Sequence, residues 1–456
     1  MMIFSFVQIF TTVILIFIIS NFLSNSIGNF AYSLLPDEAD AVNRHIKHFI
    51  VIIQGRHTFD NYFGTFPGAD GFPKNTSVPL DPFEPNQSTY AKPFHINGEV
   101  NYKARDDPPT YRLSYNNGNM NGFILAQKNN TGNPINVMGY FDNRDIPYYW
   151  KFASEYVLAQ RFFSPSMRSD LVNSLYAIDA NPSLKLQDVP IQGLEINRTI
   201  FDSLEAKNIP WRVYVENLGH IYEMNKEDTL ILKRSIPILA IPRFTDNQSL
   251  KSNISDLSEY FDDILSNKLA NVSFLYFTGS NDSPTTNVIP SQELVANLVY
   301  ALMRSQYWNS SAILITHNEA GGWYDHVKPP INNNTAELSG FRVPAIIISP
   351  YVKSAHFDSN TYDIKAFLDI IQSSFGINNT INSINNTNRM YSVFDFAQKP
   401  RQPPLLQEIP SERVTINPEQ IKGINIIYVM SLSAPVIATF CWYYVIRKSK
   451  RVKNVK

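Results

Sequence analysis

The chain is poor in cysteine and in charge. It holds one cysteine in 456 residues, Cys441, so no disulfide can form within a single copy. Charged residues make up 17% of the chain, against roughly 25% in ordinary soluble domains. The net charge is −1, and six basic residues lie in the last ten positions, which leaves about −7 on residues 1–446. This composition excludes a disulfide scaffold and argues against a nucleic-acid partner.

Both ends of the chain lack charge over long stretches. Residues 1–36 carry no charged side chain, and residues 3–22 are mostly apolar. We expect residues 1–36 to be a secretory signal peptide or, since no basic residue precedes the apolar run, an N-terminal membrane anchor. Residues 423–446 are uncharged and are followed by a basic tail at residues 447–456. They predict a transmembrane helix with the tail in the cytoplasm.

These ends predict a protein of the cell membrane with a single C-terminal span and an extracellular ectodomain at residues 37–398. Residues 399–422 contain five prolines and predict a stalk before the span. Twelve glycosylation sequons agree with export, and they begin at Asn75, Asn86, Asn129, Asn197, Asn247, Asn253, Asn271, Asn281, Asn309, Asn333, Asn378 and Asn385.

The ectodomain has the composition of a packed α/β protein. Hydrophobic residues make up 44% of the chain, and apolar runs at residues 49–53, 274–277, 312–316 and 343–348 predict buried strands. Residues 211–215 also predict a strand. Helices are expected at residues 151–158, at 202–207 with Asp202 as N-cap, and at 292–305. Residues 74–122 are rich in Pro, Asn and Gly and predict a long surface loop. This alternation favours a mostly parallel central sheet flanked by helices.

Polar residues follow the first buried strand at once, in the stretch QGRHTFDNYFGTFPGADGF (residues 54–72). The carboxyl ends of parallel strands are where ligands bind in open α/β sheets. This stretch resembles the opening motif of the phosphoesterase family of bacterial phospholipases C and acid phosphatase, Glu-Asn-(Arg/His)-(Ser/Thr)-Phe-Asp-x-Tyr-Phe-Gly. Residues 138–150, 162–181 and 315–330 are similar to later blocks of that family, in the same order. The resemblance covers roughly residues 45–400 and implies an alkaline-phosphatase-like α/β sandwich.

Such an enzyme needs a hydroxyl nucleophile and a divalent metal held by oxygen ligands. The resemblance places Gly55 and Arg56 where the family has its metal-binding Glu-Asn pair, and Asp170 where it has the nucleophile. Asn318 stands at the later Asp ligand, Ser174 and Ser283 at two family histidines, and Glu319, Asp325, His326 and Asp60 are retained. The implied metal site therefore differs from that of the family, because a permanent cation and a glycine replace two ligands.

We hypothesise that the Arg56 guanidinium takes the place of the ion and pairs with Asp170 and Glu319. The cofactor is then none, or a divalent metal held weakly by Glu319 and Asn318. Structural interpretations stay open: Asp170 as an acceptor at a helix N-terminus, and Asp325 with His326 as structural hydrogen-bonding groups.

Three functions follow from this pattern. The first is a phospholipase C-like, membrane-anchored glycoprotein with lost or much reduced hydrolysis of phosphate esters, which binds a phosphate-ester or envelope ligand. The alternative is an active phosphoester hydrolase with Asp170 as the nucleophile. The third is a structural envelope glycoprotein whose fold presents sugars.

Overall fold

The computed structural model describes residues 38–84, 86, 89–97, 102–179, 186, 188–279, 287–331, 337–377 and 390–404. Its strands are β1 (His48–Arg56), β2 (Val78–Pro79), β3 (Tyr90–Ala91), β4 (Phe94–His95), β5 (Gly139–Tyr140), β6 (Val157–Phe162), β7 (Trp211–Val215), β8 (Ile254–Asp256), β9 (Val272–Tyr276), β10 (Ser311–Glu319), β11 (Ala345–Ile348) and β12 (His356–Tyr362).

The helices alternate with these strands. They are α2 (Glu38–His45), α3 (Phe59–Phe63), α4 (Pro108–Tyr115), α5 (Phe123–Ala126), α6 (Pro147–Glu155), α7 (Asp170–Ala177), α8 (Ile200–Glu205), α9 (Leu218–Glu223), α10 (Lys226–Ser235), α11 (Pro242–Asp246), α12 (Gln248–Lys251), α13 (Glu259–Leu265), α14 (Val288–Met303) and α15 (Ile364–Ser374). Short 3-10 turns are η1 (Asn116–Gly118), η2 (Pro134–Met138), η3 (Pro237–Ala240), η4 (Trp308–Ser310) and η5 (Met390–Val393).

Eight strands form one central sheet in the order β12-β6-β11-β10-β1-β9-β7-β8. All neighbouring pairs are parallel except the two that β11 makes, with β10 and with β6. The expected mostly parallel sheet is therefore confirmed, with β11 as the antiparallel member. β1 lies in the middle, and the five apolar residues that begin at Phe49 are at most 6% exposed. A strand buried on both faces needs such a continuous apolar run.

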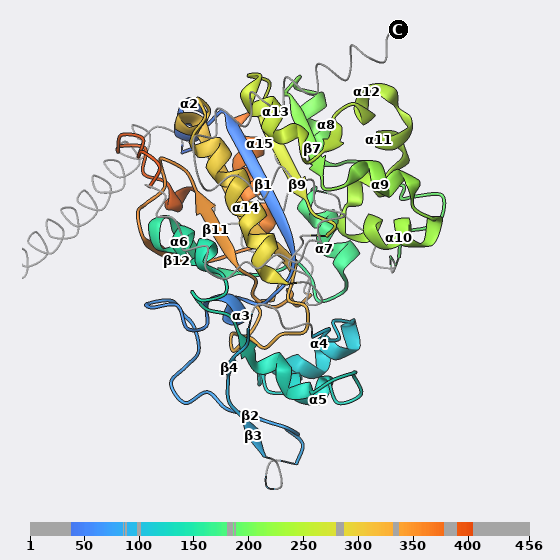
Figure 1. Cartoon of the computed structure of the whole chain (residues 1–456), viewed down its shortest axis with the longest axis vertical. Helices are drawn as coiled ribbons and strands as arrows, with labels where there is room; N and C mark the ends of the chain where they lie inside the picture. The colour runs from blue at the N-terminus through green and yellow to red at the C-terminus, as the bar shows by residue number, and fades with distance from the viewer. Residues whose placement is uncertain are drawn as a thin grey trace, which may run out of the picture. The chain divides into compact units, whose positions relative to one another are not determined.

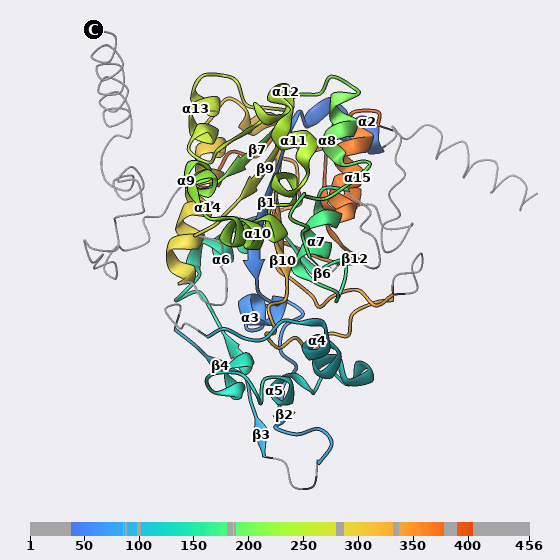
Figure 2. The same cartoon turned by 90° about the vertical axis from the view of Figure 1, so that its right-hand side faces the viewer.

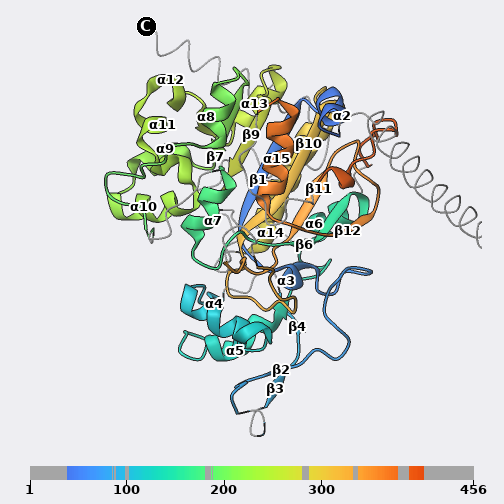
Figure 3. The same ribbon diagram turned by 180° about the vertical axis from the view of Figure 1, so that it is seen from behind.

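Helices cover both faces of this sheet. In Figure 1, α14 lies across the sheet beside α6 and α13. From behind, in Figure 3, α15 lies across the other face with α2 and α7. The strand β1 points toward α3, and the segments that carry α4 and α5 lie beyond its carboxyl end (Figures 1 and 2). Polar residues that follow β1 and β10 are therefore brought to one edge of the sheet.

The three expected helices form, but with other boundaries. The helix expected at residues 292–305 is α14, which begins at Val288 and ends at Met303. The helix expected at residues 151–158 is α6, which starts earlier because Pro147 suits the first turn, and it ends at Glu155. The residues from Val157 onward form β6, which pairs with β11 and β12. Tertiary pairing decides here, since an apolar run can serve a helix or a strand.

The N-cap of α8 is Thr199 rather than Asp202. Asp202 occupies the third helical position and completes a capping box, because its Oδ2 accepts the backbone N–H of Thr199 at 2.7 Å. Residues 74–122, expected as loop, contain α4, which Asp107 caps and Pro108 begins. Asp followed by Pro is a start signal that the surrounding turn residues obscured.

No helix among the described residues has the length and apolarity to cross a bilayer. Residues 1–36 and 423–446, where membrane segments are expected, lie outside the described residues, as does the basic tail. Of the expected stalk, only residues 399–404 are described, and Arg401 still contacts the folded unit, since its Nη1 donates to the carbonyl oxygen of Glu155 at 3.0 Å.

Candidate functional site

Arg56 ends β1 at the carboxyl edge of the sheet, where its partner in the neighbouring strand is Glu319, the last residue of β10. Its guanidinium contacts three carboxylates: Nη1 lies 2.5 Å from Oδ2 of Asp106, Nη2 lies 3.1 Å from Oδ2 of Asp170, and Nε lies 3.3 Å from Oε1 of Glu319. The structure thus brings together Arg56, Asp170 and Glu319 as the sequence hypothesis expects, and it adds Asp106. We call these four residues the Arg56 cluster.

Asp170 is the first residue of α7, so its carboxylate sits at a helix N-terminus with Ser169 as the cap. Its Oδ2 accepts the hydroxyl of Ser235 at 2.7 Å as well as the guanidinium of Arg56. The side-chain amide of Asn318 donates to its Oδ1. Both carboxylate oxygens are therefore engaged by donors of the protein itself.

Asn318 ties the cluster to α7. Its Nδ2 also donates to the main-chain oxygen of Asp170 at 3.1 Å and to Oγ of Ser174 at 3.0 Å. Ser174 stands where the resemblance implies a histidine, and it serves here as an acceptor for this amide. These bonds use Nδ2 of Asn318, whereas a metal would bind Oδ1 of the same amide.

Burial and mutual charge set the protonation of the cluster. Burial alone would lower the pKa of Arg56, but Asp170, Glu319 and Asp106 together hold that pKa well above its ordinary value. Burial raises the pKa of Glu319 well above the usual range, and the charge of Arg56 opposes this only in part. Even with Glu319 neutral, one guanidinium faces two carboxylates, so the cluster carries no net positive charge that would attract a phosphate group.

The residues of this cluster do not fit a catalytic metal. A hard divalent cation takes oxygen ligands in a cage of open coordination positions. Here Gly55 contributes no side chain, and the guanidinium of Arg56 already lies between the three carboxylates that would form such a cage. An ion would have to displace a permanent cation that the same carboxylates bind.

The other retained residues lie in a second network around Arg342, which is fully buried. Its Nη2 lies 2.9 Å from Oδ1 of Asp60, its Nε lies 3.1 Å from Oδ1 of Asp325, and its Nη1 lies 3.2 Å from Oδ2 of Asp70. His326 joins through Nδ1, which is 2.7 Å from Oδ2 of Asp60. Asp60, Asp325 and His326 are therefore partners of Arg342, and they do not bond to the Arg56 cluster.

Charge and burial compete in this network as well. Burial raises the pKa of Asp325 to about 6 in spite of the charge of Arg342. Burial would lower the pKa of His326, but its hydrogen bond to Asp60 and the charge of that carboxylate hold the pKa above its usual value. The network is thus a set of mutually neutralising groups that joins α3 to the segment after β10.

Two groups of His and Asp side chains among the described residues have ligand atoms within 4.8 Å of one another, as a metal site requires. One is Asp60, Asp325 and His326, whose oxygens already accept from Arg342 and from the backbone N–H groups of Asp60, His326 and Val327. The other is His95, Asp142 and Asp145. In this group Nη2 of Arg144 lies 2.6 Å from Oδ2 of Asp142. Both are candidates for a divalent ion, and both lie apart from the residues expected to hold one.

Two glycines after β10 bring the backbone close to Arg56. Gly321 has φ +64°, and a Cβ there would collide with the carbonyl oxygen and Cβ of Arg56. Gly322 has φ +80°, and a Cβ there would collide with the carbonyl oxygen of Arg105, next to Asp106. Only glycine permits this conformation and approach, so the pair packs both sides of the cluster.

Sequence reasoning missed Asp106 and Arg342. Asp106 lies in a stretch of turn residues with no periodic pattern, so nothing local marks it. Arg342 did carry a signal, because it stands between Phe341 and the apolar run that becomes β11. A charged residue inside such a run must be paired when it is buried.

The sequence is similar to those of known phospholipases C. Phospholipase C A of Mycobacterium tuberculosis is 25% identical over 418 residues, which cover 78% of this chain and 78% of that protein. Non-specific phospholipase C1 of Arabidopsis thaliana is 24% identical over 381 residues, which cover 76% of this chain and 68% of that protein.

Solved structures resemble this chain more distantly. The lipoteichoic acid synthase LtaP of Listeria monocytogenes has a TM-score of 0.41 at 10% identity. The match covers 77% of this chain and 79% of that protein's chain. A protein of the alkaline phosphatase superfamily from Vibrio parahaemolyticus has a TM-score of 0.34 at 14% identity, over 55% of this chain and 64% of its own. The profile of the phosphoesterase family matches residues 46–378, most of the described fold, and the chain belongs to that family.

Proposed function

We propose that this chain is a pseudoenzyme of the phosphoesterase family, in which an internal guanidinium has replaced the catalytic ion and hydrolysis of phosphate esters is lost or much reduced. The observation that carries the proposal is the position of Arg56, within 3.3 Å of the carboxylates of Asp106, Asp170 and Glu319. Loss of a nucleophile and of metal ligands removes many orders of magnitude in rate.

The protein then acts by binding. The relatives named above are phospholipases C, and we infer that this chain retains a role toward a phosphate-ester or cell-envelope ligand. The uncharged segment at residues 423–446 and the basic tail support a place in the cell membrane with the folded unit outside. The twelve sequons support glycosylation of that unit.

An active hydrolase with Asp170 as nucleophile is the alternative, and the geometry of Asp170 speaks against it. A nucleophilic carboxylate needs a free lone pair directed at the phosphorus atom. Oδ2 of Asp170 accepts from both Arg56 and Ser235, and Oδ1 accepts from Asn318, so three of the roughly four lone pairs of the carboxylate are used within the protein.

The test uses the full-length chain in detergent. We expect no turnover of a chromogenic phosphate monoester or diester above background, with or without Mn²⁺, Zn²⁺ or Ca²⁺, and no difference between wild type and Asp170→Asn. Turnover that disappears in Asp170→Asn would instead establish the alternative.

Calorimetry with Mn²⁺ and Zn²⁺ tests the replacement of the ion separately. Because two other groups could hold a metal, the informative comparison is wild type with Glu319→Gln. Metal binding that is equal in both proteins leaves the proposal intact, whereas micromolar binding that Glu319→Gln abolishes refutes it.

A further inference from the structure

A polar cavity lies at the edge of the sheet, away from the Arg56 cluster. It has a volume of about 350 Å³ and is formed by β12, by Lys353 before it and by Ser392 of η5. β12 is the outermost strand, and three strands, β6, β11 and β10, separate it from β1. Small-molecule sites begin at about this volume. The cavity is therefore large enough for a small polar ligand and independent of the site described above.

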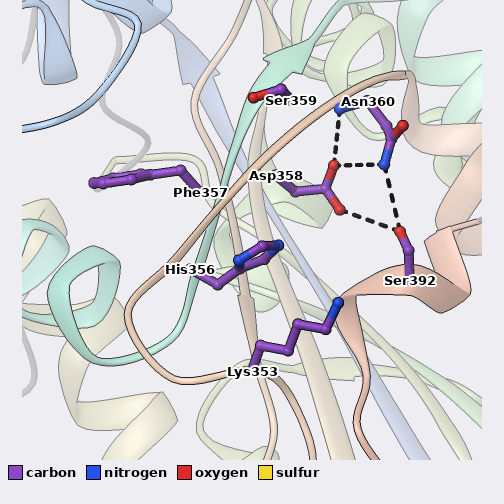
Figure 4. A pocket seen from close by; sticks show the side chains of 7 residues that line it. All are labelled: Lys353, His356, Phe357, Asp358, Ser359, Asn360 and Ser392. Atoms are coloured by element: carbon purple, nitrogen blue, oxygen red, sulfur yellow. Dashed lines mark hydrogen bonds between the residues drawn. The ribbon is translucent and has the colours of Figure 1, made fainter.

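Asp358 organises the wall of this cavity. Its Oδ1 accepts the backbone and side-chain N–H groups of Asn360 at 2.8 and 2.9 Å, and its Oδ2 accepts the hydroxyl of Ser392 at 3.2 Å (Figure 4). The hydroxyl of Tyr362 also lies 3.2 Å from Oδ2. Asp358 is only 2% exposed. Four donors thus satisfy and screen its charge, and they fix Asn360 and Ser392 in place.

The side chains of Lys353 and His356 line the same space. Figure 4 shows the ammonium of Lys353 extending toward Ser392, with the ring of His356 beside it. Among the described residues, neither the Lys353 ammonium nor the His356 ring has a hydrogen-bond or ion-pair partner. Lys353 is exposed and His356 is half-buried. The cavity therefore offers donors that the protein leaves unused.

The backbone holds these two residues firmly. The backbone N–H of Lys353 donates to the carbonyl oxygen of Val393 at 3.0 Å, and the backbone N–H of His356 donates to the carbonyl oxygen of Tyr156 at 3.0 Å. Between them Ala355 adopts φ +47°, a left-handed conformation that costs a non-glycine residue roughly 1 kcal/mol or more. Strain of this kind persists where the surrounding structure enforces it. Here the left-handed residue directly precedes β12 and places His356 at the cavity.

We propose that this cavity binds the phosphate group of a small phosphate monoester. Lysine binds phosphate as a point charge, and the imidazole N–H of His356 adds a directed donor. The side-chain N–H group of Asn360 donates to Asp358 and to Ser392, which fixes this part of the wall. The Arg56 cluster offers no such set, since all of its charges are paired within the protein.

The experiment measures the melting temperature of the full-length chain with sodium phosphate, glycerol 3-phosphate or glycerol at equal ionic strength. Both phosphate compounds are expected to raise the melting temperature, while glycerol is expected to leave it unchanged. Calorimetry then gives the affinity for glycerol 3-phosphate, which Lys353→Ala and His356→Gln should each weaken about tenfold or more.

Lys207→Ala is the matched control, because Lys207 is an exposed lysine that lies outside the cavity. It should bind glycerol 3-phosphate as wild type does. Both test residues are exposed or half-buried, so their variants should fold, and an unchanged melting temperature without ligand checks this. The proposal is wrong if neither phosphate compound stabilises wild type, or if the double variant of Lys353 and His356 binds as tightly as wild type.

Discussion

The guanidinium of Arg56 and the carboxylate of Glu319 occupy partnered positions at the ends of adjacent parallel strands, with Nε 3.3 Å from Oε1. The strand register alone therefore brings a cation against the carboxylate that family resemblance assigns to a metal. The side chain of Glu319 is 2% exposed, so this carboxylate needs a nearby positive charge or a proton.

Replacement of Arg56 by glycine should convert the cluster into a metal site. The variant keeps the carboxylates of Asp106, Asp170 and Glu319 but removes the cation between them, and these are hard oxygen ligands. We expect wild type to show no Mn²⁺ affinity that depends on Glu319, and Arg56→Gly to gain such affinity. Calorimetry checks this, with Arg56→Gly/Glu319→Gln as the control that should lose the gain.

Without metal, Arg56→Gln should destabilise the fold by somewhat less than the roughly 3–5 kcal/mol of a fully buried pair, because the Arg56 side chain is 31% exposed. Arg144→Gln is the control, because it makes the same change at a surface ion pair with Asp142. It should lower the free energy of unfolding far less. Urea denaturation at neutral pH measures both. Equal effects in the two variants would contradict the assignment of the cluster as a partly buried charge network.

Loss of Arg342 should be more severe. Arg342→Met leaves Asp60 and Asp325 buried without their guanidinium, which costs about 3–5 kcal/mol at pH 7. The deficit should shrink toward pH 5, because the orphaned carboxylates can then take up protons. Arg161→Met removes a salt bridge of 2.7 Å to Asp70 from a side chain that is 39% exposed, and should cost about 1 kcal/mol or less. Denaturation at the two pH values compares the variants.

Asp363 should make the fold less stable as the pH rises. Burial raises its pKa to about 6, so the folded chain binds a proton there that the unfolded chain releases near pH 4. The free energy of unfolding therefore falls as the pH rises from about 4 to 6, and Asp363 contributes about 1–3 kcal/mol to this fall. Asp363→Asn keeps an acceptor for the N–H of Lys365 at the start of α15 and should flatten that part of the stability profile. A variant with the slope of wild type would disprove this.

Gly322→Ala should unfold or strongly destabilise the loop beside the Arg56 cluster. The position has φ +80° and no room for a Cβ against Arg105, so the cost should exceed the roughly 1 kcal/mol of a left-handed alanine. Gly219→Ala is the control, because a Cβ at Gly219 meets nothing within 4 Å. Thermal denaturation of the two variants should separate them clearly.

A stop codon after Lys422 tests the membrane topology. If residues 423–446 span the membrane, the truncated chain should be released into the medium, whereas the full chain stays with the membrane fraction. Treatment of both with an N-glycosidase should lower their apparent mass. Retention of the truncated chain in the membrane would point to the N-terminal segment as an anchor.

Local sequence patterns were enough to predict the mostly apolar strands of the sheet. The runs that begin at Phe49 and Phe274 lie in β1 and β9, because strands buried on both faces need continuous apolar sequence. The run that begins at Trp211 forms β7 and carries one half-buried charge, Arg212. The strand β12 escaped prediction, since His356, Asp358 and Asn360 make it polar. It lies at the edge of the sheet and needs no continuous apolar run.

The candidate site divides in the same way. The order of motifs identified Arg56, Asp170 and Glu319, and opposite charge at matched positions was enough to predict that they pair. Nothing local predicted Asp106, which lies 50 residues from Arg56 along the chain and reaches it only through the packing of the segment around α4.

By itself the sequence determined that a cation and a glycine stand where oxygen ligands were expected, because residue identity and motif order are properties of the chain alone. Only the tertiary structure decided which carboxylates pair with each of the two arginines. Arg342 takes Asp60 and Asp325, while Arg56 takes Asp106, Asp170 and Glu319. A buried charge must be paired by whatever group the fold brings within reach, and that reach depends on strand register and loop packing rather than on spacing along the chain.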